Sequence, residues 1–142
     1  MESFYDLFKA AVPCHPSSAI HFPDEGKSCS YAEFLDEVDA CASTLAGYGI
    51  GSGDRVALFG QNTSHWMKAF FALMKLGAVA VPISSKSVGE DISYITKTAG
   101  VKLLLHLSDG LSAEPLDASP ASGTVPSDLQ LIMFTSGTTA NP

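Results

Sequence analysis

Apolar residues along this chain follow helical spacing in some stretches and form short continuous runs in others. Over residues 4–11 they recur every three or four positions after Ser3, which predicts a short amphipathic helix capped by that serine. Residues 18–22 and 28–31 are two short extended pieces around the turn at 23–27. The N-terminal part is therefore expected to contain one helix followed by one β-hairpin.

The helix with the clearest sequence signal follows Ser30. Ser30 and Glu33 have the spacing of a capping box, in which each side chain bonds the backbone N–H of the other residue. The apolar face predicted for this helix consists of Phe34, Val38, Cys41, Leu45 and Tyr48, with Asp36, Glu37 and Asp39 on the opposite, solvated face. A glycine-rich turn then ends the helix and leads into a strand.

From residue 55 onward, apolar runs alternate with helical segments. In order, these are a strand at 55–59, a helix at 65–76, a strand at 78–83, a helix capped by residues 87–90 and ended at Gly100, and a strand at 101–105. Near-continuous apolar strands that alternate with helices predict right-handed crossovers and a parallel sheet covered on both faces. The expected fold class is α/β, with a short helix and a hairpin ahead of the sheet.

Residues 108–127 interrupt this pattern, because Pro, Ser, Ala, Asp and Gly dominate them and large apolar residues are few. They are expected to form an exposed, poorly ordered connection. The prediction is thus an α/β subdomain over residues 1–107, a flexible linker over 108–127, and a final piece over 128–142. Within that piece, residues 129–134 form an apolar run consistent with a buried strand. The linker would allow this strand to reach a second sheet or subdomain.

Composition narrows the classes of partner. With 46% hydrophobic and 16% charged residues among 142, the chain can build a packed globular core. Its formal net charge of −7 argues against nucleic acid and anionic membranes, since binding to either depends on basic patches that release counterions. Small molecules and proteins are the expected partners.

The cysteines and the N-terminal residues favour a cytoplasmic location. The chain has three cysteines, none of them in a Cys-x-x-Cys pair, at positions Cys14, Cys29 and Cys41. Neither a disulfide framework nor a zinc site is therefore indicated. The first residues are acidic and lack the basic and apolar regions of a secretion signal. The longest apolar stretch, residues 66–81, contains two lysines and is too short to cross a bilayer, so no transmembrane segment is expected.

The candidate chemistry lies at residues 135–139, where the apolar run ends in four hydroxyl side chains around Gly137. A glycine lets the backbone turn tightly and present successive N–H groups to one point, and hydroxyl and amide donors can solvate phosphate oxygens. The same composition also suits an ordinary turn without a ligand, because Ser, Thr and Gly satisfy turn geometry by themselves. Local chemistry alone leaves both interpretations open.

The exact string favours the first interpretation. Phe-Thr-Ser-Gly-Thr-Thr-x-x-Pro resembles the phosphate loop of the adenylate-forming enzymes, which comprise acyl-CoA synthetases, adenylation domains of peptide synthetases and luciferases. Segments similar to those of the same family precede it in the same order, namely Ser-Tyr-Ala-Glu-Phe at 30–34, Gly-Asp-Arg-Val-Ala at 53–57 and Leu-Gly-Ala-Val-Ala-Val-Pro at 76–82. Two features depart from the family pattern. Ala140 replaces a glycine, and the lysine expected after Pro142 lies beyond the sequence.

The resemblance implies an ATP-dependent acid–thiol ligase. In that family a carboxylate attacks the α-phosphate of ATP to give an acyl-adenylate and pyrophosphate, and coenzyme A or a carrier protein then takes the acyl group. By position, the residues that would bind the ATP phosphates together with Mg²⁺ are Thr135, Ser136, Gly137, Thr138 and Thr139. The family's other catalytic parts follow this loop. We therefore expect an N-terminal fragment that is inactive alone, with no catalytic residue and no metal ligand of its own.

Two alternatives accompany this interpretation. The chain could instead be a finished, non-catalytic interaction module that docks through an unfilled sheet edge, since unpaired strand edges invite association. Among the scattered histidines, His65 follows a polar loop at the end of a predicted parallel strand, where open α/β sheets bind ligands. A surface position in the first turn of a helix is the simpler expectation for it.

Overall fold

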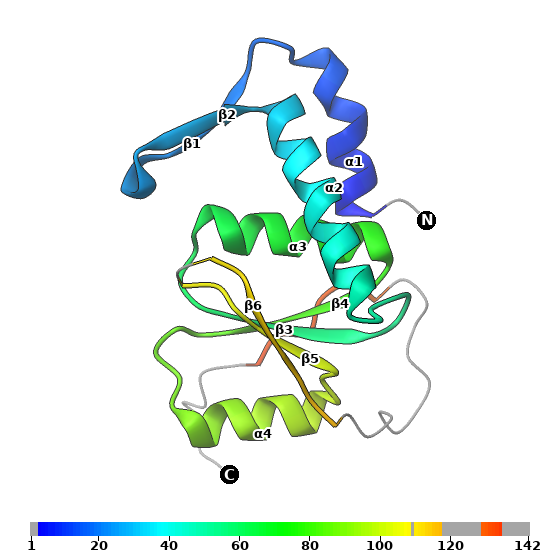
Figure 1. The fold of residues 1–142 in the computed structure, drawn as a ribbon, viewed down its shortest axis with the longest axis vertical. Helices are drawn as coiled ribbons and strands as arrows, with labels where there is room; N and C mark the ends of the chain where they lie inside the picture. Colours follow the sequence, from blue (N-terminus) through cyan, green and yellow to red (C-terminus); the bar gives the residue numbers. More distant parts are fainter. Residues whose placement is uncertain (1–2, 109, 118–128, 135–142) are drawn as a thin grey trace.

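The computed structural model describes residues 3–108, 110–117 and 129–134. Helices and the hairpin lie on one side of a twisted sheet, and one further helix covers its opposite face (Figure 1). This is the α/β architecture that the sequence predicts. The predicted phosphate loop at 135–139 and residues 118–127 of the predicted linker lie outside the described residues.

The N-terminal elements agree with the sequence pattern. Helix α1 (Phe4–Ala11) begins at Ser3, whose side chain accepts from the backbone of Asp6 in a capping box. A 3₁₀ turn (Val12–Cys14) leads to the antiparallel hairpin of β1 (Ala19–Phe22) and β2 (Lys27–Ser30), whose connection is a second 3₁₀ turn (Pro23–Glu25). Helix α2 (Tyr31–Gly47) then starts at Ser30 with the predicted capping box, because Glu33 reaches back to the Ser30 backbone N–H.

The sheet has the strand order β4-β3-β5-β6. Strands β3 (Arg55–Phe59), β4 (Val79–Ile83) and β5 (Leu103–His106) are parallel, as predicted, and are connected by helices α3 (Ser64–Leu76) and α4 (Gly89–Ala99). Strand β6 (Ser112–Pro115) pairs antiparallel with β5. This strand lies in the stretch predicted to be a poorly ordered linker, so that expectation is wrong for residues 112–115. Its side chains carry no strand pattern, and it pairs through its backbone with the exposed edge of β5.

The start of α4 also corrects the prediction. The residue at the helix N-cap is Val88, with no side-chain cap, so the expected cap at residues 87–90 does not form. Ser87 instead donates its backbone N–H to the Ser84 carbonyl over 3.0 Å, in a turn that precedes the helix. Ser87 therefore lies one residue before the N-cap position, which Val88 occupies. The predicted end at Gly100 is confirmed, because this residue has φ +65° and closes the helix in the left-handed conformation.

Strands β3, β4 and β5 are buried on both faces. Val56 and Leu58 belong to a core shared with the hairpin and helices α1, α2 and α3, whereas Ala57 and Val81 belong to a second core beneath α4. Successive residues of a strand point to opposite faces, so one strand contributes to both cores. The continuous apolar runs in the sequence have this physical origin.

Two side chains of α2 differ from their predicted surroundings. Tyr48 is 48% exposed and not part of the apolar face. Asp39, expected to be solvated, accepts from the Tyr5 hydroxyl at 2.7 Å and from Lys75 Nζ at 3.0 Å. Burial opposes ionisation of this carboxyl, but the hydrogen bonds from Tyr5 and Lys75 outweigh it, so the pKa of Asp39 is lowered. The contact therefore joins helices α1, α2 and α3.

Residues 129–134 run beside β4 in the parallel direction. Leu131 forms a bridge with Ala80, whose backbone N–H donates to the Gln130 carbonyl and whose carbonyl accepts from the Ile132 N–H, each over 2.9 Å. Leu131 is 37% and Met133 70% exposed. The segment is extended as predicted, but only one side of it packs against the core, so the prediction of a buried strand is wrong. The proposed division into domains stays a prediction.

Candidate functional site

Three parallel strands end at one edge of the sheet, and their connections leave that edge in different directions. Residues 60–63 lead from β3 to α3 on one face, whereas residues 84–88 lead from β4 to α4 on the other (Figure 1). In open α/β sheets, ligands bind outside the carboxyl ends of the strands, where neighbouring connections diverge in this way. This carboxyl edge, between the ends of β3 and β4, is the candidate functional site.

The loop after β3 is packed tightly against β5. Gly60 has φ +144°, and a Cβ at this position would lie 3.2 Å from the backbone of Leu107 and of Ser108. Thr63 accepts from the Trp66 N–H as the N-cap of α3, and its hydroxyl donates to the Leu107 carbonyl, each over 3.4 Å. Glycine is therefore required at residue 60, both by backbone conformation and by space.

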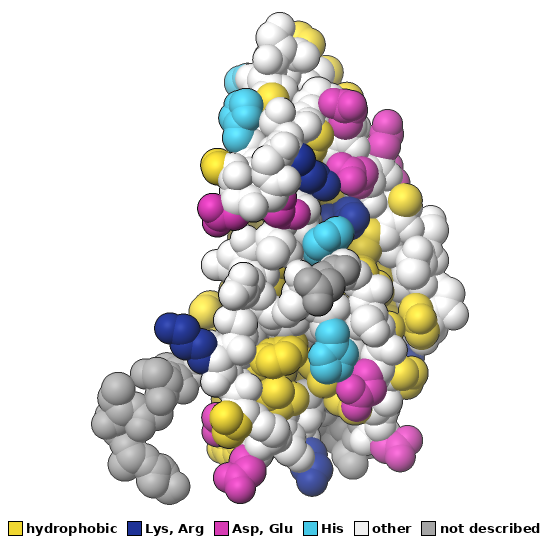
Figure 2. Space-filling view, turned by 60° about the vertical axis from the view of Figure 1, so that its left-hand side comes forward, with side chains coloured by type: hydrophobic (Ala, Val, Ile, Leu, Met, Phe, Trp, Pro, Cys, Tyr) yellow, Lys and Arg dark blue, Asp and Glu magenta, His cyan; other side chains and the backbone are white. Residues whose placement is uncertain are grey.

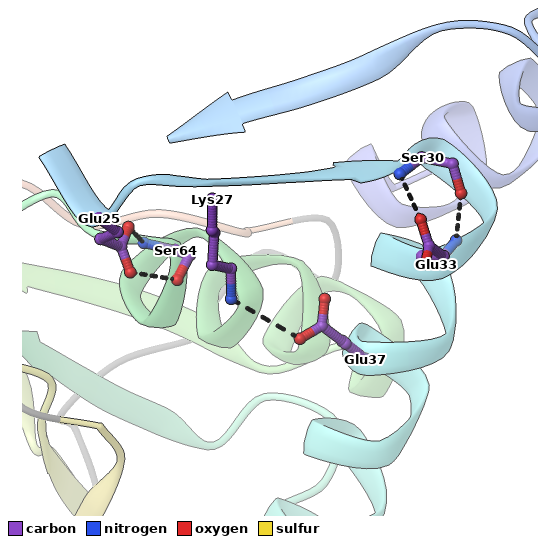
Figure 3. A network of polar contacts seen from close by, with 6 residues as sticks. All are labelled: Glu25, Lys27, Ser30, Glu33, Glu37 and Ser64. Atoms are coloured by element: carbon purple, nitrogen blue, oxygen red, sulfur yellow. Dashed lines mark hydrogen bonds and ion pairs between the residues drawn. The ribbon is translucent and has the colours of Figure 1, made fainter. Parts of the chain in front are cut away.

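The tip of the hairpin reaches the start of α3 through Glu25. Its two carboxylate oxygens accept from the Ser64 N–H at 2.9 Å and from the Ser64 hydroxyl at 2.7 Å (Figure 3). Ser64 is buried, so without Glu25 its polar groups would lose these partners. The Ser64 hydroxyl and N–H lower the pKa of Glu25. The sequence analysis missed this contact, which joins residues 39 positions apart.

We expect Glu25→Gln to weaken folding at neutral pH and to make stability less dependent on pH. The folded-state pKa of Glu25 lies below its ordinary value, so its carboxylate stabilises the fold above the unfolded pKa and stops doing so as pH falls through the folded pKa. Urea unfolding at pH 7 and near pH 3 should show a wild-type advantage at pH 7 that shrinks toward zero in acid. Asp24→Asn in the same turn is the matched control; an equal loss there would contradict a specific role.

Two histidines lie near the carboxyl ends of the parallel strands. His65 is half-buried in the first turn of α3, in agreement with the simpler expectation for it. His106 lies at the end of β5, with Nε2 3.0 Å from Glu114 Oε1 on β6. Among the residues with described positions, no group of three His, Cys, Asp or Glu side chains is arranged to hold a metal ion.

Residues 129–134 bring the chain to the candidate edge. Because they run parallel to β4, Phe134 lies toward the carboxyl end of the sheet. Phe134 packs against the core beneath α4, to which Ile83 of β4 belongs, and its ring centroid lies 6.3 Å from that of Tyr94 on α4. The predicted phosphate-binding residues follow directly in the sequence. Their positions lie outside the described ranges, so their role stays a prediction.

The surface and the helices give two further observations. On the face drawn in Figure 2, Lys and Arg side chains are scattered among acidic and uncharged ones and form no continuous basic patch. None of the helices described for residues 3–108 is both long and apolar enough to cross a membrane.

Comparison of the sequence with known proteins identifies a matching family and several relatives. A family model described as AMP-binding enzyme matches residues 8–142. The chain is 29% identical to the long-chain-fatty-acid–CoA ligase FadD13 of Mycobacterium tuberculosis, over 84% of this chain and 29% of the ligase. It is also 29% identical to the phenyloxazoline synthase MbtB of Mycolicibacterium paratuberculosis, over 99% of this chain and 13% of the synthase. The chain thus spans less than a third of these relatives.

Solved structures agree in fold. The N-terminal domain of FACL13 from Mycobacterium tuberculosis has a TM-score of 0.70 and 30% identity, over 73% of this chain and 26% of that structure. The N-terminal subdomain of Klebsiella oxytoca NpsA in complex with 3-hydroxyanthranilyl-AMSN has a TM-score of 0.76 and 26% identity, over 98% of this chain and 38% of that structure. Both matched structures are N-terminal portions of larger proteins.

Proposed function

This chain belongs to the AMP-binding enzyme family, and from that premise we propose that it is the N-terminal portion of an ATP-dependent acid–thiol ligase. The observation that carries the proposal is the string Thr-Ser-Gly-Thr-Thr at residues 135–139, which follows a segment parallel to β4. The matched ligase and synthase support the same class of reaction.

The donors of residues 135–139 fit a triphosphate. Four hydroxyl groups and the backbone N–H groups around Gly137 are donors that match phosphate oxygens, and they need no charge of their own. In our proposal, Thr135, Ser136, Thr138 and Thr139 would bind the β- and γ-phosphates together with Mg²⁺. The ion supplies charge neutralisation when it is bound.

The contribution of this chain to the reaction is positioning. Activation of a carboxylic acid requires the carboxylate oxygen and the α-phosphate to meet in line while negative charge leaves with pyrophosphate. In this proposal, binding of the terminal phosphates by the residues that follow the segment bridged to β4 restricts the approach of the α-phosphate. Coenzyme A or a carrier thiol is the proposed acceptor of the acyl group, and the cytoplasm is the proposed location.

We expect the 142-residue chain alone to show no ATP–pyrophosphate exchange above background with any carboxylic acid. The resemblance places the adenine, acyl and catalytic lysine contacts of the family after this loop. Radiolabelled pyrophosphate incorporation into ATP is the measurement, with an intact relative as the positive control. Exchange above background would show that the chain contains a complete catalytic site, contrary to the proposal.

A second candidate function is a non-catalytic interaction module. It is favoured by Leu131 and Met133, which expose apolar surface on the segment beside β4. The reading frame after Pro142 separates the two candidates. Codons for Lys-Gly or Lys-Ala followed by several hundred residues would favour the ligase, and a stop codon would favour the module.

A further inference from the structure

An open cavity of about 340 Å³ lies between helices α2 and α3, on the face of the sheet opposite α4. This volume is at the lower end of the range for small-molecule sites, roughly 300–1,000 Å³. We propose that the cavity binds a small monocarboxylate with an apolar body, and that Lys68 of α3 holds the carboxylate. The lining residues come from a different part of the sequence than the predicted phosphate loop, so the inference goes beyond the proposed function.

Two helices and the segment before β6 form the walls of this cavity. The lining positions of α2 have the spacing i, i+3, i+4 and i+7, so they share one face of the helix. Leu111 forms a further wall, because the pairing of β6 with β5 returns the preceding residue to the core beneath α2 and α3. The described residues that line the cavity are Glu37, Ala40, Cys41, Thr44, Lys68 and Leu111.

The charges around the cavity favour a ligand with one negative charge. Glu37 lies 4.0 Å from Lys27 of β2, so its carboxylate already has a cationic neighbour (Figure 3). Lys68 is half-buried and forms no ion pair within the described part of the chain. An ammonium group that is partly removed from water gains from a nearby anion, because the solvent screens the pair less. A second negative charge on the ligand would meet Glu37 and be repelled.

The inner wall of the cavity is uncharged. Burial raises the pKa of the Cys41 thiol, and the charge of Lys68 opposes that shift, so the ammonium group lies near enough to act on this wall. The thiol therefore stays protonated at neutral pH and does not repel an anion. Together with Ala40 and Leu111, it offers apolar surface beside a single cation. This combination fits a carboxylate attached to a short chain or a single ring.

Titration of sodium benzoate into the isotopically labelled 142-residue chain, followed by amide NMR shifts at low salt, tests the inference. Amides of residues 40–44 and 68 should shift and saturate in the millimolar range. Lys68→Gln should weaken binding about tenfold, whereas Lys68→Arg should keep it within about threefold because the charge remains. Lys97→Gln removes the same charge from the last turn of α4, on the opposite face of the sheet, and should bind as the wild type does.

Ala40→Leu tests the cavity itself. Ala40 is exposed at the cavity wall, so leucine there fills the space without changing any charge, and benzoate binding should weaken at least about tenfold. Ser43→Leu adds the same side chain at an exposed position of α2 outside the lining set, and should bind as the wild type does. Methyl benzoate, which has no charge, and isophthalate, which brings a second carboxylate toward Glu37, should both bind more weakly than benzoate. Thermal unfolding verifies that each variant is folded.

Several results would overturn the inference. Wild-type affinity in folded Lys68→Gln or Ala40→Leu would overturn the assignment of the carboxylate to this cavity. An equal loss in Lys68→Gln and Lys97→Gln would do the same, because net charge alone then explains binding. Isophthalate that binds as tightly as benzoate would overturn the preference for a monocarboxylate, and absence of shifts up to about 50 mM benzoate would overturn the site. None of these measurements involves ATP, so their failure leaves the proposed phosphate loop unaffected.

Discussion

Phe34→Ala is expected to lower the free energy of unfolding by about 3–5 kcal/mol, a large fraction of the stability of a domain of this size. Phe34 is 1% exposed, and its ring centroid lies 5.8 Å from Phe8, 6.4 Å from Phe22 and 6.1 Å from Phe71. These partners belong to α1, β1 and α3. Truncation therefore leaves a cavity at the point where three elements meet the helix α2.

Urea unfolding followed by circular dichroism measures this effect. Tyr48→Ala, which removes an aromatic ring that is 48% exposed at the end of the same helix, should change stability by less than about 1 kcal/mol. A similar loss in both variants would contradict a special contribution of the buried Phe34 ring to stability. Phe34→Leu should recover much of the loss because it refills most of the volume.

Alanine at Thr135, Ser136, Thr138 and Thr139 together should lower adenylate formation at least about 100-fold in a ligase that carries this sequence as its N-terminal portion. The reason is that preorganised donors aimed at developing negative charge stabilise the transition state. Initial rates of pyrophosphate release at saturating acid measure the effect, with thermal unfolding to verify the fold.

Ala140→Gly is the matched control for the loop substitutions. It restores the glycine that the adenylate-forming family usually carries and leaves the four hydroxyls unchanged, so the rate should be equal or higher. An undiminished rate in the quadruple alanine variant would end the assignment of this loop to the phosphates.

Elements whose signals are local could be predicted from the sequence. The caps at Ser3 and Ser30 depend on residues three positions away, and Gly100 ends its helix through its own backbone conformation. The parallel sheet followed from apolar runs that must be covered on both faces. The caps and the helix end depend on residues close in sequence, and the sheet was predicted from the apolar pattern within each strand.

The features that escaped prediction depend on distant partners. Strand β6 exists because the edge of β5 accepts its backbone, although Ser112 and Glu114 give no strand pattern. Asp39 accepts hydrogen bonds from Tyr5 and Lys75, which lie 34 and 36 residues away in the sequence. Likewise, the bond from Ser64 to Glu25 requires the hairpin to fold over the start of α3. For the predicted phosphate loop at residues 135–139, the structure adds one observation to the sequence signal, which is that residues 129–134 run parallel to β4.

The bridge between Ala80 and Leu131 also has a consequence during synthesis on the ribosome. Strands β3, β4 and β5 can assemble once residue 106 has emerged, but the outer edge of β4 must await residues 129–134. At typical elongation rates of roughly 5–20 residues per second, that edge stays open to other chains for seconds. A nascent polypeptide stalled in this interval would expose an aggregation-prone surface and would be a substrate for chaperones.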